Sequence, residues 1–299
     1  MIFINYYDEI KKELLNNEIT KKVKNYSINK SDLTTYYNVG KLLAEAGKHY
    51  GEGIIKEYSD RLSSELNIKY SVRTLYKIIK YFNYMNKQKV PTVSAKLSWS
   101  HYDELLKLTD ENIINYYIKI SEEQNLSVRE LRKKIKSNEY ERLDEETKKK
   151  LKDKEKLKVP DLVKNPIKIR NTSGNNEISE KVLQKLILED IPAFLDELGN
   201  GFTFVRNEYK IKIGDRYNYI DLLLYNIKYK CYVVVELKVT ELNSNHTGQI
   251  QKYMNYIDKN IKNIDDNKTV GIIICKKENK YVIEYCSDNR IISREYELV

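Results

Sequence analysis

The sequence contains little cysteine. Only three cysteines occur among 299 residues, Cys231, Cys275 and Cys286, and none stands in a CxxC or Cys/His spacing. A set this small, odd in number and unpatterned argues against a disulfide framework and against a structural zinc site. The three side chains are therefore predicted to be free thiols buried in strands.

Long hydrophobic runs are also missing. The apolar start, Met1 to Ile4, gives way at once to polar residues, and no stretch approaches the ~20 apolar residues of a membrane-spanning helix. We therefore expect a protein that has no membrane contact and works in the cytoplasm.

Positive charge is in surplus and is unevenly distributed. The net charge is +9, and residues 1–158 hold 32 basic and 24 acidic side chains against 21 and 20 in residues 159–299. A basic N-terminal half suits a polyanionic partner such as nucleic acid. Lys, Asn, Ile and Tyr are all abundant, however, as AT-rich codon usage alone would produce, so charge leaves both explanations open.

Helical periodicity dominates the first 143 residues. Apolar residues recur at three- and four-residue intervals over four stretches, 5–25, 32–47, 52–66 and 71–85. Arg73, Lys77 and Lys80 lie off the apolar stripe of the last helix, for which Ser71 is a good N-cap. Two helices joined by a tight turn, the second basic on its outer face, fit a helix-turn-helix reader of nucleic acid. A helical bundle with a solvated lysine face fits the same pattern.

Two short segments complete the N-terminal half. Ser100 and Asp103 have the spacing of a capping box, with Trp99 just ahead of the helix. For the nearby His101 we expect packing or hydrogen bonding, because no second histidine or cysteine accompanies it. Residues 144–165 mix both charges with almost nothing apolar at first, which predicts a charged linker between a helical domain, 1–143, and a second domain, 166–299.

The second domain is predicted to mix strands and helices. A helix is expected from about 177 to Gly199, kinked or interrupted at Pro192, and another over 246–260. Strands are expected at 202–213, 218–226, 231–239, 269–276, 280–286 and 293–298. The fold class is therefore α+β, with an all-α N-terminal domain followed by a mixed central sheet flanked by helices.

Three charged residues lie on two neighbouring strands of this sheet. Glu236 and Lys238 share one face of their strand because strand side chains alternate, and a short connection would bring Asp221 across toward Glu236. A Glu-x-Lys pair alone is more often part of a solvated charged face than of a functional site. Here, however, the flanking runs, Leu222 to Leu224 and Val233 to Val235, indicate strands buried on both faces, where charges need partners or a metal.

This donor set suits Mg²⁺, with Mn²⁺ able to replace it. Hard cations take oxygen ligands and usually one or two carboxylates, which Asp221 and Glu236 supply, with the backbone carbonyl of Leu237 as a third ligand. Lys238 could orient the attacking water and offset charge on a phosphate. Gln249 and Tyr253, four residues apart on the following helix, share one face and could touch the same site.

Several segments of the sequence also resemble the YhcG-type PD-(D/E)xK nuclease family. They are LSWSHYDELL (97–106), LSVRELRKKIKSNEYERL (126–143), ELGNGFTFV (197–205), YIDLLLYN (219–226), CYVVVELK (231–238), GQIQKYMNY (248–256) and VGIIICKKEN (270–279). The resemblance implies a restriction-endonuclease-like core in which Asp221, Glu236 and Lys238 are catalytic and Gln249 and Tyr253 line the site. It further implies an assisting glutamate in the first helix of the core, for which Glu189 is the matching position.

Residues and resemblance together predict a metal-dependent nuclease that hydrolyses phosphodiester bonds, in DNA rather than RNA and as an endonuclease rather than an exonuclease. One such site cuts one strand, so cutting both strands would need a homodimer or sequential nicks. The N-terminal domain would bind nucleic acid, through Arg73, Lys77 and Lys80, or a partner protein. Two alternatives remain, an RNA-directed nuclease and a non-catalytic binding or assembly module that keeps the nuclease scaffold.

Overall fold

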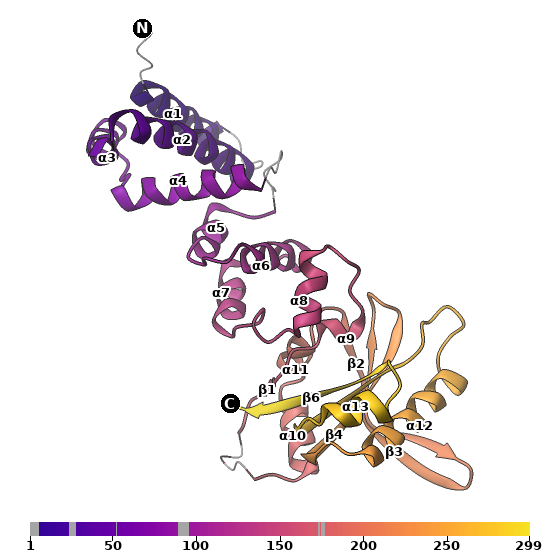
Figure 1. Cartoon of the computed structure of the whole chain (residues 1–299). Coiled ribbons are helices and arrows are strands. Elements are labelled where there is room, and N and C mark those ends of the chain that lie inside the picture. The colour runs from indigo at the N-terminus through magenta and orange to yellow at the C-terminus, as the bar shows by residue number, and fades with distance from the viewer. Residues whose placement is uncertain (1–5, 24–27, 52, 89–95, 173, 175–176) are drawn as a thin grey trace. The chain divides into compact units, whose positions relative to one another are not determined.

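The computed structural model describes the chain except for residues 1–5, 24–27, 52, 89–95, 173 and 175–176 (Figure 1). The chain divides into two compact units, Met1–Ser137 and Asn138–Val299. None of the helices described is both long enough and apolar enough to cross a membrane.

The first unit is all helical, as predicted. Its helices are α1 (Tyr6–Val23), α2 (Ile28–Tyr50), α3 (Gly53–Leu66), α4 (Val72–Lys87), α5 (Trp99–Leu105), α6 (Glu111–Gln124) and α7 (Val128–Lys136). The predicted helix at 5–25 corresponds to α1, and residues 5, 24 and 25 lie outside the described part. Leu43 of α2 and Leu75 and Ile78 of α4 are fully buried in one apolar cluster. Ser71 caps α4, with its hydroxyl accepting from the Thr74 amide at 3.2 Å.

The predicted capping box at Ser100 and Asp103 is wrong. Ser98 is the N-cap of α5, and its backbone amide donates to Nδ1 of His101 at 3.1 Å. Nε2 of His101 donates to the Leu126 carbonyl at 2.9 Å, so the imidazole joins two segments of this unit. His101 therefore has the hydrogen-bonding role that was expected of it.

The second unit contains a six-stranded mixed sheet. Its helices are α8 (Glu145–Lys152), α9 (Val159–Leu162), α10 (Glu180–Glu189), α11 (Ile191–Leu198), α12 (Ser244–Asn260) and α13 (Lys280–Cys286). Its strands are β1 (Ile167–Ile169), β2 (Phe202–Ile213), β3 (Arg216–Asn226), β4 (Cys231–Glu241), β5 (Val270–Lys277) and β6 (Ile291–Leu298), in the spatial order β1-β6-β5-β4-β3-β2. β2, β3 and β4 are antiparallel neighbours, whereas β4, β5, β6 and β1 pair in parallel. The predicted fold class, helical then mixed sheet with flanking helices, is confirmed.

Helices cover both faces of the sheet. Val233, Val235 and Leu237 of β4 pack in a cluster with α10 and α11, whereas Val234 packs with α12. This arrangement explains the unbroken apolar runs, because every residue of a doubly covered strand faces a helix. Glu236 and Lys238 therefore face α12.

Two predictions about this unit are corrected. Residues 280–286 form helix α13 and not a strand, because Asn279 caps a helical turn by accepting from the Val282 amide at 3.4 Å. Cys286 is thus the last residue of a helix, whereas Cys231 and Cys275 are free and buried in strands, as predicted.

Pro192 interrupts the predicted 177–199 helix, which is divided at Asp190 into α10 and α11.

The predicted linker, 144–165, belongs to the second unit. Arg294 of β6 donates to the Asp144 carboxylate at 2.6 Å and to the Val163 carbonyl at 3.0 Å. Val159 and Val163 are buried in the core of the sheet. The sequence did not predict this packing against the sheet, because charged side chains dominate the segment and its few apolar residues recur with no regular period.

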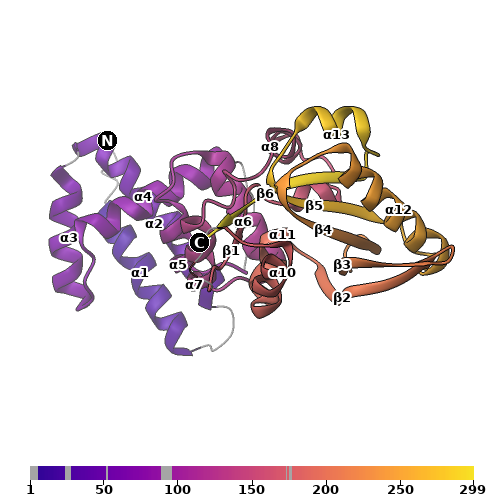
Figure 2. The ribbon, with the colours of Figure 1, turned by 90° about the horizontal axis from the view of Figure 1, so that it is seen from below.

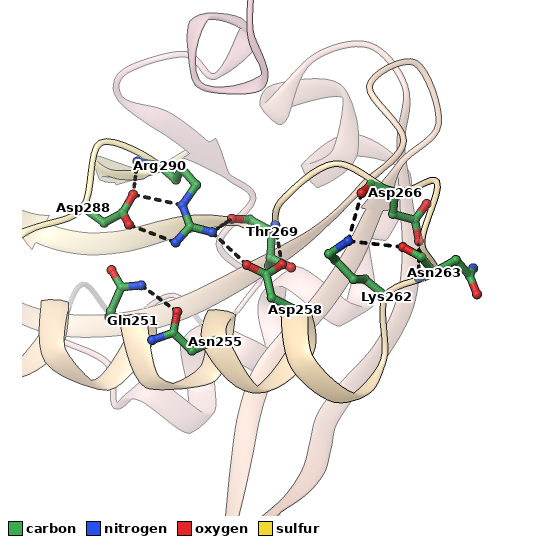
Figure 3. A network of polar contacts seen from close by, with 9 residues as sticks. All are labelled: Gln251, Asn255, Asp258, Lys262, Asn263, Asp266, Thr269, Asp288 and Arg290. Carbon is green, nitrogen blue, oxygen red and sulfur yellow. Dashed lines mark hydrogen bonds and ion pairs between the residues drawn. The ribbon is translucent and has the colours of Figure 1, made fainter.

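A polar network fixes the C-terminal half of α12 beside the sheet (Figure 3). Arg290 donates to Asp258 of α12 and to Asp288, in both cases at 2.9 Å, and to the Thr269 carbonyl at 3.2 Å. The Thr269 amide in turn donates to Asp258 at 2.8 Å. These bonds hold α12, and with it Gln249 and Tyr253, in a fixed position on β4 and β5.

Candidate active site

The site begins where β3 and β4 part. Their pairing ends at Leu222 and Val235, and beyond this pair the amide of Leu237, two residues after Val235, donates to Oδ2 of Asp221 at 2.8 Å. A side-chain carboxylate thus takes the place of the next ladder bond. The separated strands bring the Asp221 side chain to the backbone of β4, beside Glu236, as the sequence predicts.

Glu236 is almost completely buried, with 1% of its surface exposed. Its Oε2 accepts from Gln249 at 2.9 Å and lies 3.7 Å from Nζ of Lys238, whereas Oε1 is buried without a hydrogen-bond partner. Burial, and next the charge of Asp221, raise the pKa of Glu236 to about 8, against the opposing effect of Lys238. Burial likewise raises the pKa of Asp221, against the Leu237 amide and Lys238.

Helix α12 borders the site with Gln249 and Tyr253. Gln249 also lies with Nε2 at 3.2 Å from the hydroxyl of Tyr253, so the two side chains meet over one turn, as their spacing predicts. Burial raises the pKa of Tyr253, so its hydroxyl stays protonated at neutral pH. His246 begins the same helix, where its Nδ1 accepts from the Asn243 amide at 3.3 Å. Burial, and next the charge of Lys238, lower the pKa of His246.

The glutamate of α10 that reaches the site is Glu180 and not Glu189. Oε2 of Glu180 lies 3.5 Å from Nζ of Lys238. Glu189, at the other end of α10, accepts from Thr172 at 2.7 Å and lies 4.0 Å from Lys185. The ten-residue helix is ~15 Å long, so its two ends serve different surroundings. Sequence spacing gave no means of telling which end faces β4.

Two of the three basic residues of α4 that were expected to contact nucleic acid have partners within their own unit. Within the first unit, Lys77 pairs with Asp103 of α5 and Lys80 donates to the Leu106 carbonyl, so both tie α4 to its neighbours. Arg73 is exposed at the start of the helix. Of the three residues proposed for nucleic-acid contact, two have intramolecular partners.

The donor set fits a magnesium ion. Over the part of the chain that the structure describes, no group of three or more His, Cys, Asp and Glu side chains is arranged so that it could hold a metal ion by itself. Mg²⁺ does not need one, because it takes one or two carboxylates and fills its other positions with water and substrate phosphate. The unpartnered Oε1 of Glu236, beside Asp221, is a buried oxygen of the kind that such a cation takes as a ligand.

Comparison with known proteins agrees with these observations. Residues 160–298 match the model of the YhcG PDDEXK nuclease domain, and residues 10–142 match that of the DUF1016 N-terminal domain. By these matches residues 160–298 are a YhcG-type PDDEXK nuclease domain, as the sequence motifs indicate, and residues 10–142 are the DUF1016 N-terminal domain. A protein described as "Putative nuclease YhcG", from Escherichia coli (strain K12), is 26% identical over 219 residues. That match covers 69% of this chain and 58% of the relative, so the chain spans less than two thirds of the relative's length.

Two solved structures resemble part of the chain more distantly. A repair endonuclease from Pyrococcus abyssi is 19% identical with a TM-score of 0.29, over 42% of this chain and 49% of that one. The EndoMS-dsDNA2 complex is 18% identical with a TM-score of 0.29, over 43% and 48%. The fold assignment stands on the strand order and on the family match.

Proposed function

We propose that this chain is a Mg²⁺-dependent endonuclease that hydrolyses phosphodiester bonds of DNA. The observation that carries the proposal is the buried Glu236 carboxylate with one unpartnered oxygen, next to Asp221 and 3.7 Å from the Lys238 ammonium. Structural ion pairs normally satisfy their charges, and two carboxyl groups with raised pKa values beside one lysine are typical of a functional site.

Asp221 and Glu236 would hold the metal, with the Leu237 carbonyl as a further ligand. The Leu237 amide donates to Asp221 across the gap between β3 and β4. Because the N–H and C=O of one strand residue point to the same side, the carbonyl is directed into the same gap. A bound Mg²⁺, or Mn²⁺ in its place, would lower the pKa of water and polarise the phosphate.

The remaining residues act around these ligands. Lys238 would orient the attacking water and offset negative charge that develops on the phosphate, while Glu180 pairs with its ammonium at 3.5 Å. Gln249 donates to Glu236 and fixes the orientation of its carboxylate. Tyr253 in turn lies against Gln249, so both α12 residues support the ligand and do not themselves react.

The wider setting follows from this site. A single site cuts one strand, so cutting of both strands requires a homodimer or two successive nicks. The helical unit would contribute binding to nucleic acid or to a partner protein, and the surplus positive charge of residues 1–158 supports the first. The absence of a membrane-spanning helix among the described residues leaves a cytoplasmic location as our expectation.

Plasmid cleavage tests the proposal. Supercoiled plasmid, single-stranded DNA and RNA of matched length are each incubated with Mg²⁺, Mn²⁺ or EDTA. We expect nicked and then linear plasmid with either metal, no product in EDTA, and slower cleavage of RNA. Asp221→Asn and Glu236→Gln should each reduce the rate by at least ~100-fold.

Other outcomes would assign other functions. Faster cleavage of RNA than of DNA would make the protein an RNA-directed nuclease. A wild type that is inert with every substrate, yet binds DNA equally well with metal and with EDTA, would favour the non-catalytic scaffold.

A further inference from the structure

Strands β2 and β3 continue beyond the sheet as a two-stranded ribbon. β4 pairs only with Leu222–Asn226 of β3, whereas the earlier part of β3 pairs with β2 alone (Figure 2). The ribbon closes at Gly214, whose φ of +59° is the value that the first central position of a type II′ turn requires. Glu208 has a φ of +45° opposite Asp221, and this bend marks where the ribbon leaves the site.

The two faces of this ribbon differ in what covers them. On the inner face, Ile211 and Ile220 are 1% and 0% exposed and pack in the cluster that contains α12. Tyr217 and Tyr219 stand on the outer face and are 58% and 53% exposed. Packing against α12 thus accounts for the apolar residues of the inner face, whereas no packing among the described residues accounts for the exposed tyrosines of the outer face.

Lysines stand opposite both tyrosines on the outer face. Lys212 pairs with Tyr217 and Lys210 with Tyr219 across the two strands, and both lysines are exposed. Nζ of Lys210 lies 3.8 Å from the ring centroid of Tyr217, and Nζ of Lys212 lies 6.0 Å from it. Aromatic rings interleaved with ammonium groups, without a carboxylate between them, form a surface that attracts phosphate and stacks on bases.

The spacing of the rings suits a nucleic-acid strand. Residues two apart on a strand are ~7 Å apart, about twice the ~3.4 Å between neighbouring bases, so the two rings are spaced to hold one base between them or to stack on every second base. Tyr219 is two residues from Asp221 along β3, so the first ring lies ~7 Å along the strand from the catalytic carboxylate. Base faces are open to such stacking only where the strand is unpaired.

We propose that the outer face of this ribbon binds the single-stranded part of a DNA substrate next to the bond that is cut. Tyr217 and Tyr219 stack on unpaired bases, and Lys210 and Lys212 contact the phosphates between them. The substrate is therefore DNA with a single-stranded segment, such as a flap, a gap or a fork. This inference rests on the proposed nuclease function, because it takes the position of the bond from that site.

Binding is measured by fluorescence anisotropy in EDTA, so that no hydrolysis is needed. The full-length chain is offered a labelled single strand, a fork and a blunt duplex. The double variant Tyr217→Ala/Tyr219→Ala should bind the single strand and the fork at least ~10-fold more weakly, with less than ~2-fold change for the duplex. Lys210→Ala/Lys212→Ala should weaken single-strand binding and reduce its logarithmic salt slope by roughly 1.4.

Matched controls lie elsewhere on the same unit. Tyr281 and Tyr285 of α13 are 75% and 74% exposed, so Tyr281→Ala/Tyr285→Ala removes two exposed rings outside the ribbon. Lys276 and Lys280 are exposed as well, so Lys276→Ala/Lys280→Ala removes the same charge. Both control variants should bind like the wild type, and circular dichroism melting checks that all variants fold.

Each remaining result has one meaning. Wild-type affinity of the ribbon variants, an equal loss in the controls, or no nucleic-acid binding by the wild type would overturn the ribbon proposal. Plasmid cleavage with Mg²⁺ is scored separately on the same proteins. Cleavage with unchanged ribbon binding removes this inference alone, whereas ribbon-dependent binding without any cleavage removes the nuclease proposal and keeps the ribbon as a single-strand binding surface.

Discussion

Glu236 joins stability to function within one carboxyl group. It is buried in the sheet with Gln249 and Lys238 beside one of its oxygens. Such a group is costly to ionise in the absence of a cation. A bound cation would offset this cost by its attraction to the ionised carboxylate. Because ionising Glu236 destabilises the metal-free fold, its ionisation can be measured from protein stability without any substrate.

Metal-free stability should depend on pH through this residue. Its pKa in the folded protein, about 8, lies above the ordinary 4.5, so the folded state holds the proton more tightly than the unfolded state does. The stabilising contribution is therefore full below pH 4.5 and is lost as the pH rises through about 8, by on the order of 5 kcal/mol in total. In EDTA, Glu236→Gln should abolish most of this decline and melt at a higher temperature than the wild type at pH 8.

Urea denaturation between pH 5 and pH 8 measures this effect, with Glu189→Gln as the control. Glu189 is bonded at the far end of α10, so its variant should keep the wild-type decline. A Glu236→Gln protein with the same slope as the wild type would contradict the raised pKa.

The two glutamates of α10 offer a second comparison. Glu180→Gln removes the charge that lies 3.5 Å from the Lys238 ammonium, so the plasmid cleavage rate should fall by roughly 10-fold. Glu189→Gln should leave the rate within about 2-fold of the wild type. The reverse order of effects would place Glu189 in the site and would refute the assignment made from the structure.

At the scale of elements, close helix packing in the first unit depends on one glycine. A Cβ added to Gly40 of α2 would lie 2.6 Å from the Ile78 carbonyl oxygen and 2.6 Å from Cβ of Phe82, both on α4. Neither atom is the end of a flexible side chain, so the two helices would have to separate. Gly47 of the same helix has open space around the equivalent position.

Gly40→Ala should therefore destabilise the helical unit by about 1–3 kcal/mol. Gly47→Ala adds the same methyl group where nothing obstructs it, and it should be neutral or stabilising by up to about 1 kcal/mol. Thermal melting followed by circular dichroism at 222 nm compares the two variants. Equal destabilisation by both would show that helix propensity, and not the contact between α2 and α4, sets the effect.

At the scale of the whole molecule, the division at Ser137 and Asn138 puts the proposed metal ligands and the helical unit in different compact units. A cation that binds only the second unit stabilises that unit by mass action, about 2.7 kcal/mol at 100 times its dissociation constant. We expect Mg²⁺ to raise the melting temperature of one calorimetric transition by several degrees and to leave the other unchanged.

The same experiment with Asp221→Asn/Glu236→Gln should show no shift with Mg²⁺. Gly40→Ala should lower only the transition that Mg²⁺ does not move, which assigns the two transitions to their units. A single transition that Mg²⁺ and Gly40→Ala both move would mean that the two units unfold together.

Much of the site is readable from local pattern. Alternation on β4 put Glu236 and Lys238 on one face, the four-residue spacing put Gln249 beside Tyr253, and the short connection brought Asp221 across. These inferences succeed because each depends on the geometry of one element or of one hairpin. Likewise, the unbroken apolar runs in β3 and β4 correctly predicted strands that are covered on both faces.

What the sequence alone determined is thus the order and type of most elements, the family and the set of charged residues. Only the tertiary structure decided that Glu180 and not Glu189 meets Lys238, that 144–165 docks on β6 through Asp144, and that 280–286 is helical. Each of these depends on contacts between segments far apart in the chain, and local spacing carries no information about which distant partner a side chain meets. For the same reason the exposed outer face of the β2–β3 ribbon became visible only when the packing of its inner face against α12 was known.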